Sequence, residues 1–280
     1  MQTAGQVENR IKELTRHGQS IWLDFIARSF VRGGELKQLV EDDGIRGVTS
    51  NPSIFEKAIA RSDDYQEQMD ELLTDRNLDV NDIYEQLAIA DIKEACDALR
   101  PVYVETVGRD GYVSMEVSPL LASDTQATIS EALRLRKAVD KSNLMIKVPA
   151  TVEGIPAVEA LIGEGLSVNV TLLFGRETYA QVAEAYMAGL EKYAQTHDDL
   201  SGIASVASFF VSRIDSAVDK LLDEKIAKNE TDKDKKAAGH LLGKIAIANA
   251  KLAYQIYREL FTSPRWKALV AKGARPQRLL

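Results

Sequence analysis

The feature that most constrains this chain is a repeated alternation of short apolar runs with longer segments of helical periodicity. Helical spacing is clear, for example, in residues 125–139 and 176–195. Strands that alternate with helices predict parallel strands joined by helical crossovers, in an open doubly wound sheet or a closed β/α barrel. The apolar runs have the length of buried β-strands and lie at residues 20–25, 47–52, 112–117, 144–150, 166–174 and 203–210.

The length of 280 residues fits one barrel domain over residues 1–280, because a TIM-type (β/α)8 barrel takes roughly 250 residues. We expect an amphipathic opening segment and a helical insertion at about residues 56–107. The mixed-charge stretch at residues 225–240 predicts a solvated loop. Residues 278–280 look like the start of a seventh strand. Strand 8 and most of strand 7 are therefore expected to be absent from this chain.

Charge and cysteine content exclude several classes of function. The net charge of −7 argues against broad binding to nucleic acid or to an anionic membrane surface. No run approaches the roughly 20 apolar residues of a membrane span, and the first 14 residues lack the apolar core of a secretory signal. Cys96 is the single cysteine, so neither an internal disulfide nor a Cys-rich metal site can form, and we expect it to be buried. These features predict a cytoplasmic protein, with the oligomeric state left open.

Lys147 interrupts an apolar strand, which is the first sign of chemistry. Burial of an ammonium is costly unless the group is paired or loses its proton. A desolvated lysine can present the neutral amine that attacks a carbonyl and forms a Schiff base. The alternative is a lysine that extends from a strand end into water.

Polar side chains share one face of the neighbouring strands. Because side chains alternate along a strand, Ser114 and Glu116 point one way, and Asn169 and Thr171 likewise share a face. Residues 168, 170 and 172 should then cover the helix-facing side of their strand. Asp24 also closes a strand-like run. Polar groups directed into a barrel near the carboxyl ends of its strands predict an active site there.

Schiff-base chemistry has a use for each of these groups. Protons must move on and off oxygen and nitrogen as the imine forms, and a substrate hydroxyl must lose its proton during C–C cleavage. Glu116 and Asp24 can meet those needs, or either can simply neutralise Lys147. Thr171 can hold a water molecule or bond to the backbone.

The chain resembles the transaldolase family in four motifs that occur in the family's order. Residues 84–92 also resemble the helical insertion of longer bacterial transaldolases, including those fused to an isomerase domain. The motifs are Gly-Val-Thr-Ser-Asn-Pro-Ser-Ile-Phe at 47–55, Ser-Met-Glu-Val-Ser-Pro at 114–119, Met-Ile-Lys-Val-Pro-Ala-Thr at 145–151 followed by Glu-Gly-Ile at 153–155, and Val-Asn-Val-Thr-Leu-Leu-Phe at 168–174.

The resemblance implies a pentose-phosphate-pathway transferase that needs neither a metal nor an organic cofactor. It would move a dihydroxyacetone unit from sedoheptulose 7-phosphate to glyceraldehyde 3-phosphate, giving erythrose 4-phosphate and fructose 6-phosphate. Lys147 would form the imine, and Glu116 and Thr171 would handle the catalytic water. Asp24 would be the acid and base at the hydroxyl whose proton leaves during C–C cleavage.

The resemblance also implies the substrate-binding residues. Asn51 and Asn169 would hold hydroxyls of the bound dihydroxyacetone, and Thr49 would be a further substrate-binding residue. Ser208 would contact substrate, and Arg213 would bind phosphate, which suits the planar fork of its guanidinium. A surface ion pair of Arg213 with a neighbour such as residue 215 is the alternative. Phenylalanine at 209 and serine at 212 depart from the short-chain pattern. Two other functions stay open: an aldolase that releases free dihydroxyacetone, and a truncated chain that only binds sugar phosphates.

Overall fold

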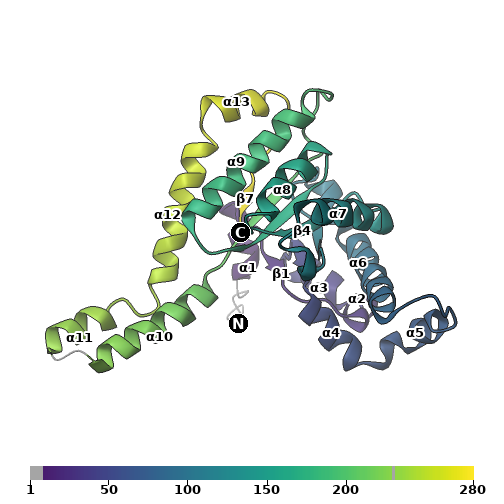
Figure 1. Cartoon of the computed structure of the whole chain (residues 1–280), viewed down its shortest axis with the longest axis horizontal. Helices are drawn as coiled ribbons and strands as arrows, with labels where there is room; N and C mark the ends of the chain where they lie inside the picture. The colour runs from purple at the N-terminus through teal and green to yellow at the C-terminus, as the bar shows by residue number, and fades with distance from the viewer. Residues whose placement is uncertain (1–8, 229–230) are drawn as a thin grey trace, which may run out of the picture. The chain divides into compact units, whose positions relative to one another are not determined.

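The computed structural model of the chain describes residues 9–228 and 231–280 and resolves them into two compact units. The first unit holds the described residues up to Pro119 together with Ser130–Lys147 (Figure 1). The second unit holds Leu120–Ile129 and Val148–Leu280. The predicted opening segment begins in residues 1–8, outside the described residues, and continues as α1 (Arg10–Arg16).

Parallel strands in chain order form the sheet of the first unit. These are β1 (Trp22–Leu23), β2 (Gly47–Thr49), β3 (Tyr112–Glu116) and the first four residues of β4 (Leu144–Pro149). Gly47 lies opposite Trp22 in the register. A Cβ atom on Gly47 would meet the Trp22 ring at 2.4 Å, so glycine is needed for the ring to lie over β2.

Helices fill the connections of the first unit. After β1 come α2 (Arg28–Arg32), α3 (Glu35–Gln38) and the π-helix η1 (Leu39–Asp43). After β2 come α4 (Pro52–Ala60), the 3-10 turn η2 (Asp63–Tyr65), α5 (Gln66–Leu72) and α6 (Val80–Glu105). A reciprocal capping box between Asp79 and Asp82 starts α6. The buried face of α6 includes Leu87, Ile92, Cys96 and Leu99. Helix α7 (Thr125–Val139) follows β3.

The second unit repeats the strand-then-helix pattern. The strands β5 (Val168–Leu173), β6 (Ser205–Phe209) and β7 (Arg278–Leu279) pair in parallel. Figure 1 shows α9 beside α12 and α10 beside α11. The helices are α8 (Gly154–Gly163), α9 (Arg176–Tyr193), α10 (Ser212–Lys228), α11 (Asp232–Gly239), α12 (Ile245–Leu260) and α13 (Pro264–Val270).

Parallel strands in chain order with intervening helices confirm the predicted α/β fold class of the TIM-barrel type. The start of a seventh strand at residue 278 is also confirmed, because β7 pairs with β6. No helix in the described ranges is long and apolar enough to cross a membrane.

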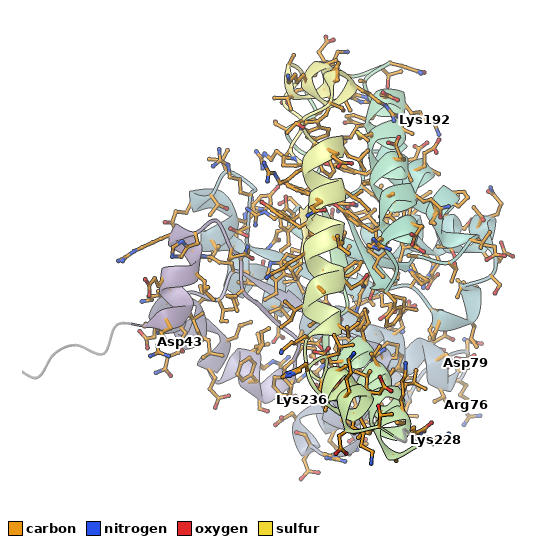
Figure 2. The ribbon with its side chains drawn as sticks, turned by 90° about the vertical axis from the view of Figure 1, so that its left-hand side faces the viewer. Asp43, Arg76, Asp79, Lys192, Lys228 and Lys236 are labelled. Atoms are coloured by element: carbon orange, nitrogen blue, oxygen red, sulfur yellow. The ribbon has the colours of Figure 1, made fainter. Side chains whose placement is uncertain are left out.

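The prediction of a solvated loop at residues 225–240 was wrong. Helix α10 continues to Lys228, and α11 occupies residues 232–239, with Lys228 and Lys236 labelled on these helices in Figure 2. The Thr231 hydroxyl accepts a hydrogen bond from the backbone N–H of Asp234 and caps α11. Ala238 is buried. Mixed charge therefore marks exposed helical faces here and not the absence of a helix.

The predicted alternation along β5 also fails at one point. The register moves from Val170 opposite Ala207 to Leu173 opposite Phe209, so β5 carries an extra residue in a bulge. Leu172 has a φ of 59° and is 41% exposed, and Leu173 takes the buried position instead. Leu172 is therefore not on the helix-covered face that simple alternation predicts.

Candidate active site

Lys147 is buried in the first unit, near the carboxyl end of β4, and only 8% of its surface is exposed. Its ammonium donates a hydrogen bond to the backbone carbonyl of Ser50 at 3.1 Å and lies 3.5 Å from Glu116 Oε2. Ser50 is itself fixed, because its buried hydroxyl donates to the Ser114 carbonyl at 2.8 Å. The amine is thus held inside the protein, which contradicts the alternative of a lysine that extends into water.

Glu116 lies directly opposite Lys147 in the parallel register of β3 and β4, so both side chains project from the same face. Burial raises the pKa of Glu116, the charge and hydrogen bond of Lys147 oppose that rise, and the negative charge of Asp24 adds to it. A carboxyl group whose pKa is raised holds its proton more readily than an ordinary one, which suits a group that must both accept and return protons.

Asp24 follows β1 directly and carries an exposed side chain. It makes no side-chain hydrogen bond or ion pair with any other residue that the structure describes. Its charge nevertheless acts on Glu116. The first unit therefore brings Lys147, Glu116 and Asp24 together at the carboxyl ends of β1, β3 and β4.

Thr49 and Asn51 stand at the end of β2. The Thr49 hydroxyl is buried and lacks a hydrogen-bond partner among the described residues, a state that a bound polar group would relieve. Asn51 is the N-cap of α4, and its side-chain oxygen accepts the backbone N–H of Ile54 at 3.0 Å. The cap occupies the carbonyl side of the Asn51 amide, so its NH₂ group is the part left to donate to a ligand.

Tyr84 is a neighbour of the site that the motifs did not reveal. Its ring packs edge-on against Phe55 of α4 with centroids 6.4 Å apart. Burial raises the pKa of Tyr84 to about 12, and the charges of Glu116 and Glu56 add to the rise. Tyr84 opens the stretch 84–92 that resembles the family's helical insertion, but an aromatic residue at helical spacing usually belongs to the core, so it was not predicted as a site residue.

The second unit contains the remaining predicted residues. Asn169 and Thr171 are buried on β5, and the Ser208 hydroxyl of β6 donates to Asn169 Oδ1 at 2.8 Å. Arg213 lies in the first turn of α10 with its guanidinium 4.8 Å from the centre of the Phe210 ring. Asp215, the ion-pair alternative for Arg213, accepts the backbone N–H of Ala246 at 3.0 Å.

The groups of the first unit can support imine chemistry. A desolvated amine beside a carboxyl group, with a buried hydroxyl at the end of a neighbouring strand, can attack a carbonyl and shuttle the protons that dehydration requires. In the described residues, no group of three or more His, Cys, Asp or Glu side chains is placed to hold a metal ion.

Comparison with known proteins shows which family the chain resembles along most of its length. The family described as "Transaldolase/Fructose-6-phosphate aldolase" matches residues 21–276. A transaldolase of Trichodesmium erythraeum is 52% identical over 98% of this chain and 72% of its own length. "Transaldolase 2" of a Nostoc species is 50% identical over 97% of this chain and 71% of its own length. A transaldolase of Saccharopolyspora erythraea is 49% identical over the same shares of the two chains, 97% and 71%.

Proposed function

Because the chain belongs to the transaldolase/fructose-6-phosphate aldolase family, we propose that it is a transaldolase that acts through a Schiff base on Lys147. It transfers a dihydroxyacetone unit from sedoheptulose 7-phosphate to glyceraldehyde 3-phosphate and gives erythrose 4-phosphate and fructose 6-phosphate. Its substrates are sugar phosphates of the pentose phosphate pathway. The proposed location is the cytoplasm, which agrees with a chain whose single cysteine cannot form an internal disulfide.

One observation carries the proposal: the buried Lys147 amine, 3.5 Å from Glu116 and fixed on the Ser50 carbonyl. The neutral amine attacks the ketone of the donor sugar and forms a carbinolamine. Glu116 moves the protons as water leaves and the imine forms. The imine nitrogen then accepts the electron pair of the breaking C–C bond, while Asp24 takes the proton of the adjacent hydroxyl and the aldehyde departs. The resulting enamine attacks the acceptor aldehyde in the reverse sequence.

The other predicted residues have supporting roles in this proposal. Thr171 holds the catalytic water that Glu116 uses. Thr49, Asn51 and Asn169 bind the hydroxyls of the dihydroxyacetone unit, and Ser208 contacts substrate. Arg213 binds the phosphate, supported by its place in the first turn of α10, where the helix dipole also favours an anion.

An aldolase that releases free dihydroxyacetone is the second candidate, because the matched family description includes fructose-6-phosphate aldolase. The two enzymes share the imine and differ in the fate of the enamine. Incubation with fructose 6-phosphate in the presence and absence of erythrose 4-phosphate separates them. A transferase turns over only with the acceptor, whereas turnover that ignores the acceptor identifies the aldolase.

Borohydride reduction in the presence of fructose 6-phosphate tests the nucleophile. Peptide mapping should find the adduct on Lys147, and Lys147→Ala should abolish it while circular dichroism stays unchanged. Lys141 lies three residues before β4 and is paired with Asp97. Lys141→Ala is therefore the control variant, and it should leave the labelling of Lys147 intact. An unmodified Lys147 in the folded parent protein would exclude the catalytic proposal.

A further inference from the structure

Asp24 needs an accurate position, yet its own side chain does not provide it. The strand before it, β1, has only two residues, and residues 24–27 have no regular secondary structure. Helix α2 then begins without a side-chain cap at Ala27. The carboxylate makes no hydrogen bond of its own within the described ranges, so the backbone of this short segment alone determines where it points.

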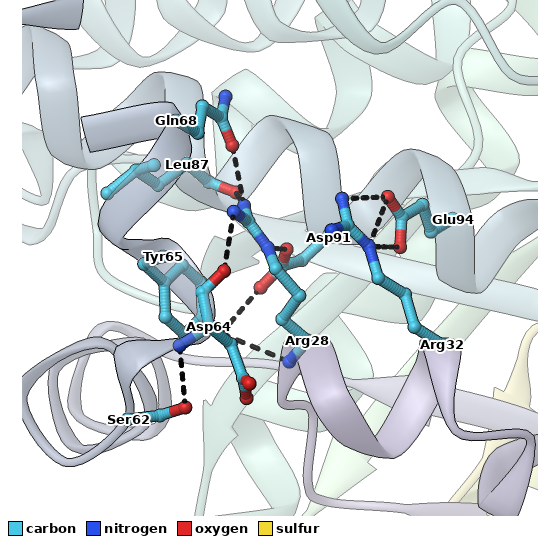
Figure 3. A network of polar contacts seen from close by, with 9 residues as sticks. All are labelled: Arg28, Arg32, Ser62, Asp64, Tyr65, Gln68, Leu87, Asp91 and Glu94. Carbon is cyan, nitrogen blue, oxygen red and sulfur yellow. Dashed lines mark hydrogen bonds and ion pairs between the residues drawn. The ribbon is translucent and has the colours of Figure 1, made fainter. Parts of the chain in front are cut away.

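Arg28, the first residue of α2, anchors the end of that segment. It is 2% exposed, and its Nε donates to Asp91 Oδ1 at 2.8 Å. One terminal nitrogen donates to Gln68 Oε1 at 2.7 Å (Figure 3). The backbone N–H of Arg28 donates to the Tyr65 hydroxyl at 3.1 Å, and that hydroxyl donates to Asp91 Oδ2 at 2.7 Å.

Arg28, Asp91 and Tyr65 form a closed cycle of hydrogen bonds that fixes both the main chain and the side chain of Arg28. Asp91 of α6 is fully buried and uses both oxygens, one for Arg28 and one for Tyr65. The Tyr65 ring also lies 4.3 Å from the guanidinium carbon. A planar guanidinium bound in this way has little freedom to turn, so α2 cannot shift along α6 without breaking several charge-assisted bonds.

Stability alone is a weak reason for such a cluster. A buried ion pair often contributes no more than well-packed apolar side chains of the same volume, because both charges must leave water. Burial raises the pKa of Asp91 despite its hydrogen bonds to Tyr65 and Arg28, so the desolvation cost is not fully offset. Hydrogen bonds give what apolar packing cannot, namely one defined direction and distance.

We propose that Arg28, Asp91 and Tyr65 are positioning residues that fix the segment after β1 and thereby hold Asp24 at its working distance from the substrate. This inference rests on the proposed function, in which Asp24 serves C–C cleavage and Lys147 forms the imine. Loosening the cluster should therefore slow cleavage and leave imine formation in place.

Tyr65→Phe is the primary test because it deletes one hydroxyl and leaves the ring over the guanidinium. The variant loses the acceptor of the Arg28 N–H and the donor to Asp91. The double variant Arg28→Met/Asp91→Leu removes the whole charged pair without leaving a lone buried charge. Arg32→Gln is the matched control, because Arg32 joins the same helices α2 and α6 through an exposed pair with Glu94 (Figure 3).

Two measurements on the full chain separate positioning from general damage. The first is the fraction of Lys147 trapped by borohydride with fructose 6-phosphate. The second is the single-turnover release of glyceraldehyde 3-phosphate. We expect Tyr65→Phe to keep at least half of the trapped fraction and to slow release at least about fivefold, since a misplacement of about 1 Å can cost roughly 100-fold. The double variant should show the same split, and Arg32→Gln should stay within about twofold of the parent.

Slowing of less than fivefold in Tyr65→Phe, a parallel fall in trapping and release, or equal slowing in Arg32→Gln would each overturn the inference. Failure of the proposed function itself looks different. In that case the parent protein shows no adduct on Lys147.

Discussion

Replacing Glu116 by glutamine is the most direct perturbation of the site. The change preserves the size of the side chain and removes its charge and its ability to exchange protons. Lys147 loses a carboxylate 3.5 Å away but keeps the hydrogen bond to the Ser50 carbonyl at 3.1 Å. We therefore expect Lys147 to stay in place and still form the imine, while the steps that need Glu116 to carry a proton become slow.

The expected magnitude follows from the role and from the geometry. General acid–base catalysis typically contributes 10²–10⁴-fold, which equals about 3–5 kcal/mol of activation free energy at 1.36 kcal/mol per decade. Two unit charges 3.5 Å apart attract by about 5 kcal/mol at an effective dielectric constant of 20. That gross attraction is of the same order as the catalytic term, and the side chains are only 11% and 17% exposed, so solvent screens it little.

The assay compares kcat with the trapped imine over a range of pH. Because burial raises the pKa of Glu116, its proton-accepting form disappears as pH falls through that raised value, and the parent should lose activity there. Glu116→Gln should lack this acidic limb and show a kcat lower by roughly 10²–10⁴-fold, with a trapped fraction at least equal to that of the parent. Glu56→Gln, on the exposed side of α4, is the control for charge removal nearby.

Two results would refute this reasoning. Parent-like kcat in Glu116→Gln would remove Glu116 from the mechanism. Loss of trapping together with turnover, even after prolonged incubation, would mean that Glu116 is needed for Lys147 to react at all, and not only to speed the proton transfers of imine formation.

Three further predictions concern stability and binding. Gly47→Ala should destabilise the protein by about 1–3 kcal/mol in urea unfolding, because the new Cβ would lie 2.4 Å from the Trp22 ring. Adding Trp22→Leu should restore much of the lost stability. An unchanged unfolding midpoint in Gly47→Ala alone would contradict the predicted clash. Arg213→Gln should raise KM for fructose 6-phosphate about 10–200-fold with a smaller effect on kcat, as expected for loss of about 1.5–3 kcal/mol of charged hydrogen bonding; an unchanged KM would exclude Arg213 as the phosphate ligand. Because its pKa is raised, Glu116 binds a proton more readily in the folded chain than in the unfolded chain, so the free energy of unfolding should fall as pH rises from the ordinary carboxyl range through the raised pKa. Urea titrations at successive pH values should show this fall in the parent protein and not in Glu116→Gln. The same dependence of the unfolding free energy on pH in both proteins would contradict the prediction.

Local sequence was sufficient for much of the fold and for the centre of the site. Apolar runs of strand length and the alternation of side chains along a strand are short-range properties. They predicted β3, β4 and the shared face of Glu116 and Lys147, which the register of those strands reproduces. The helix over residues 125–139 has the bounds that its periodicity predicts.

One of the two failures has a non-local cause and the other a local one. A bulge depends on how two strands meet, so nothing in the residues of β5 alone announced that Leu172 would turn outward. A charged stretch is compatible with a loop or with an exposed helix, and capping by Thr231 decides between them at α11.

What the sequence determined by itself is which residues are chemically exceptional: a lysine in an apolar strand, and polar side chains at strand ends. What only the tertiary structure decided is how they are held. The Ser50 carbonyl that binds Lys147 belongs to the backbone, which every residue possesses, and the Asp91 carboxylate that binds Arg28 is 63 residues away along the chain. Such partners are brought together by packing of distant elements, a long-range outcome that residue type and spacing do not encode locally.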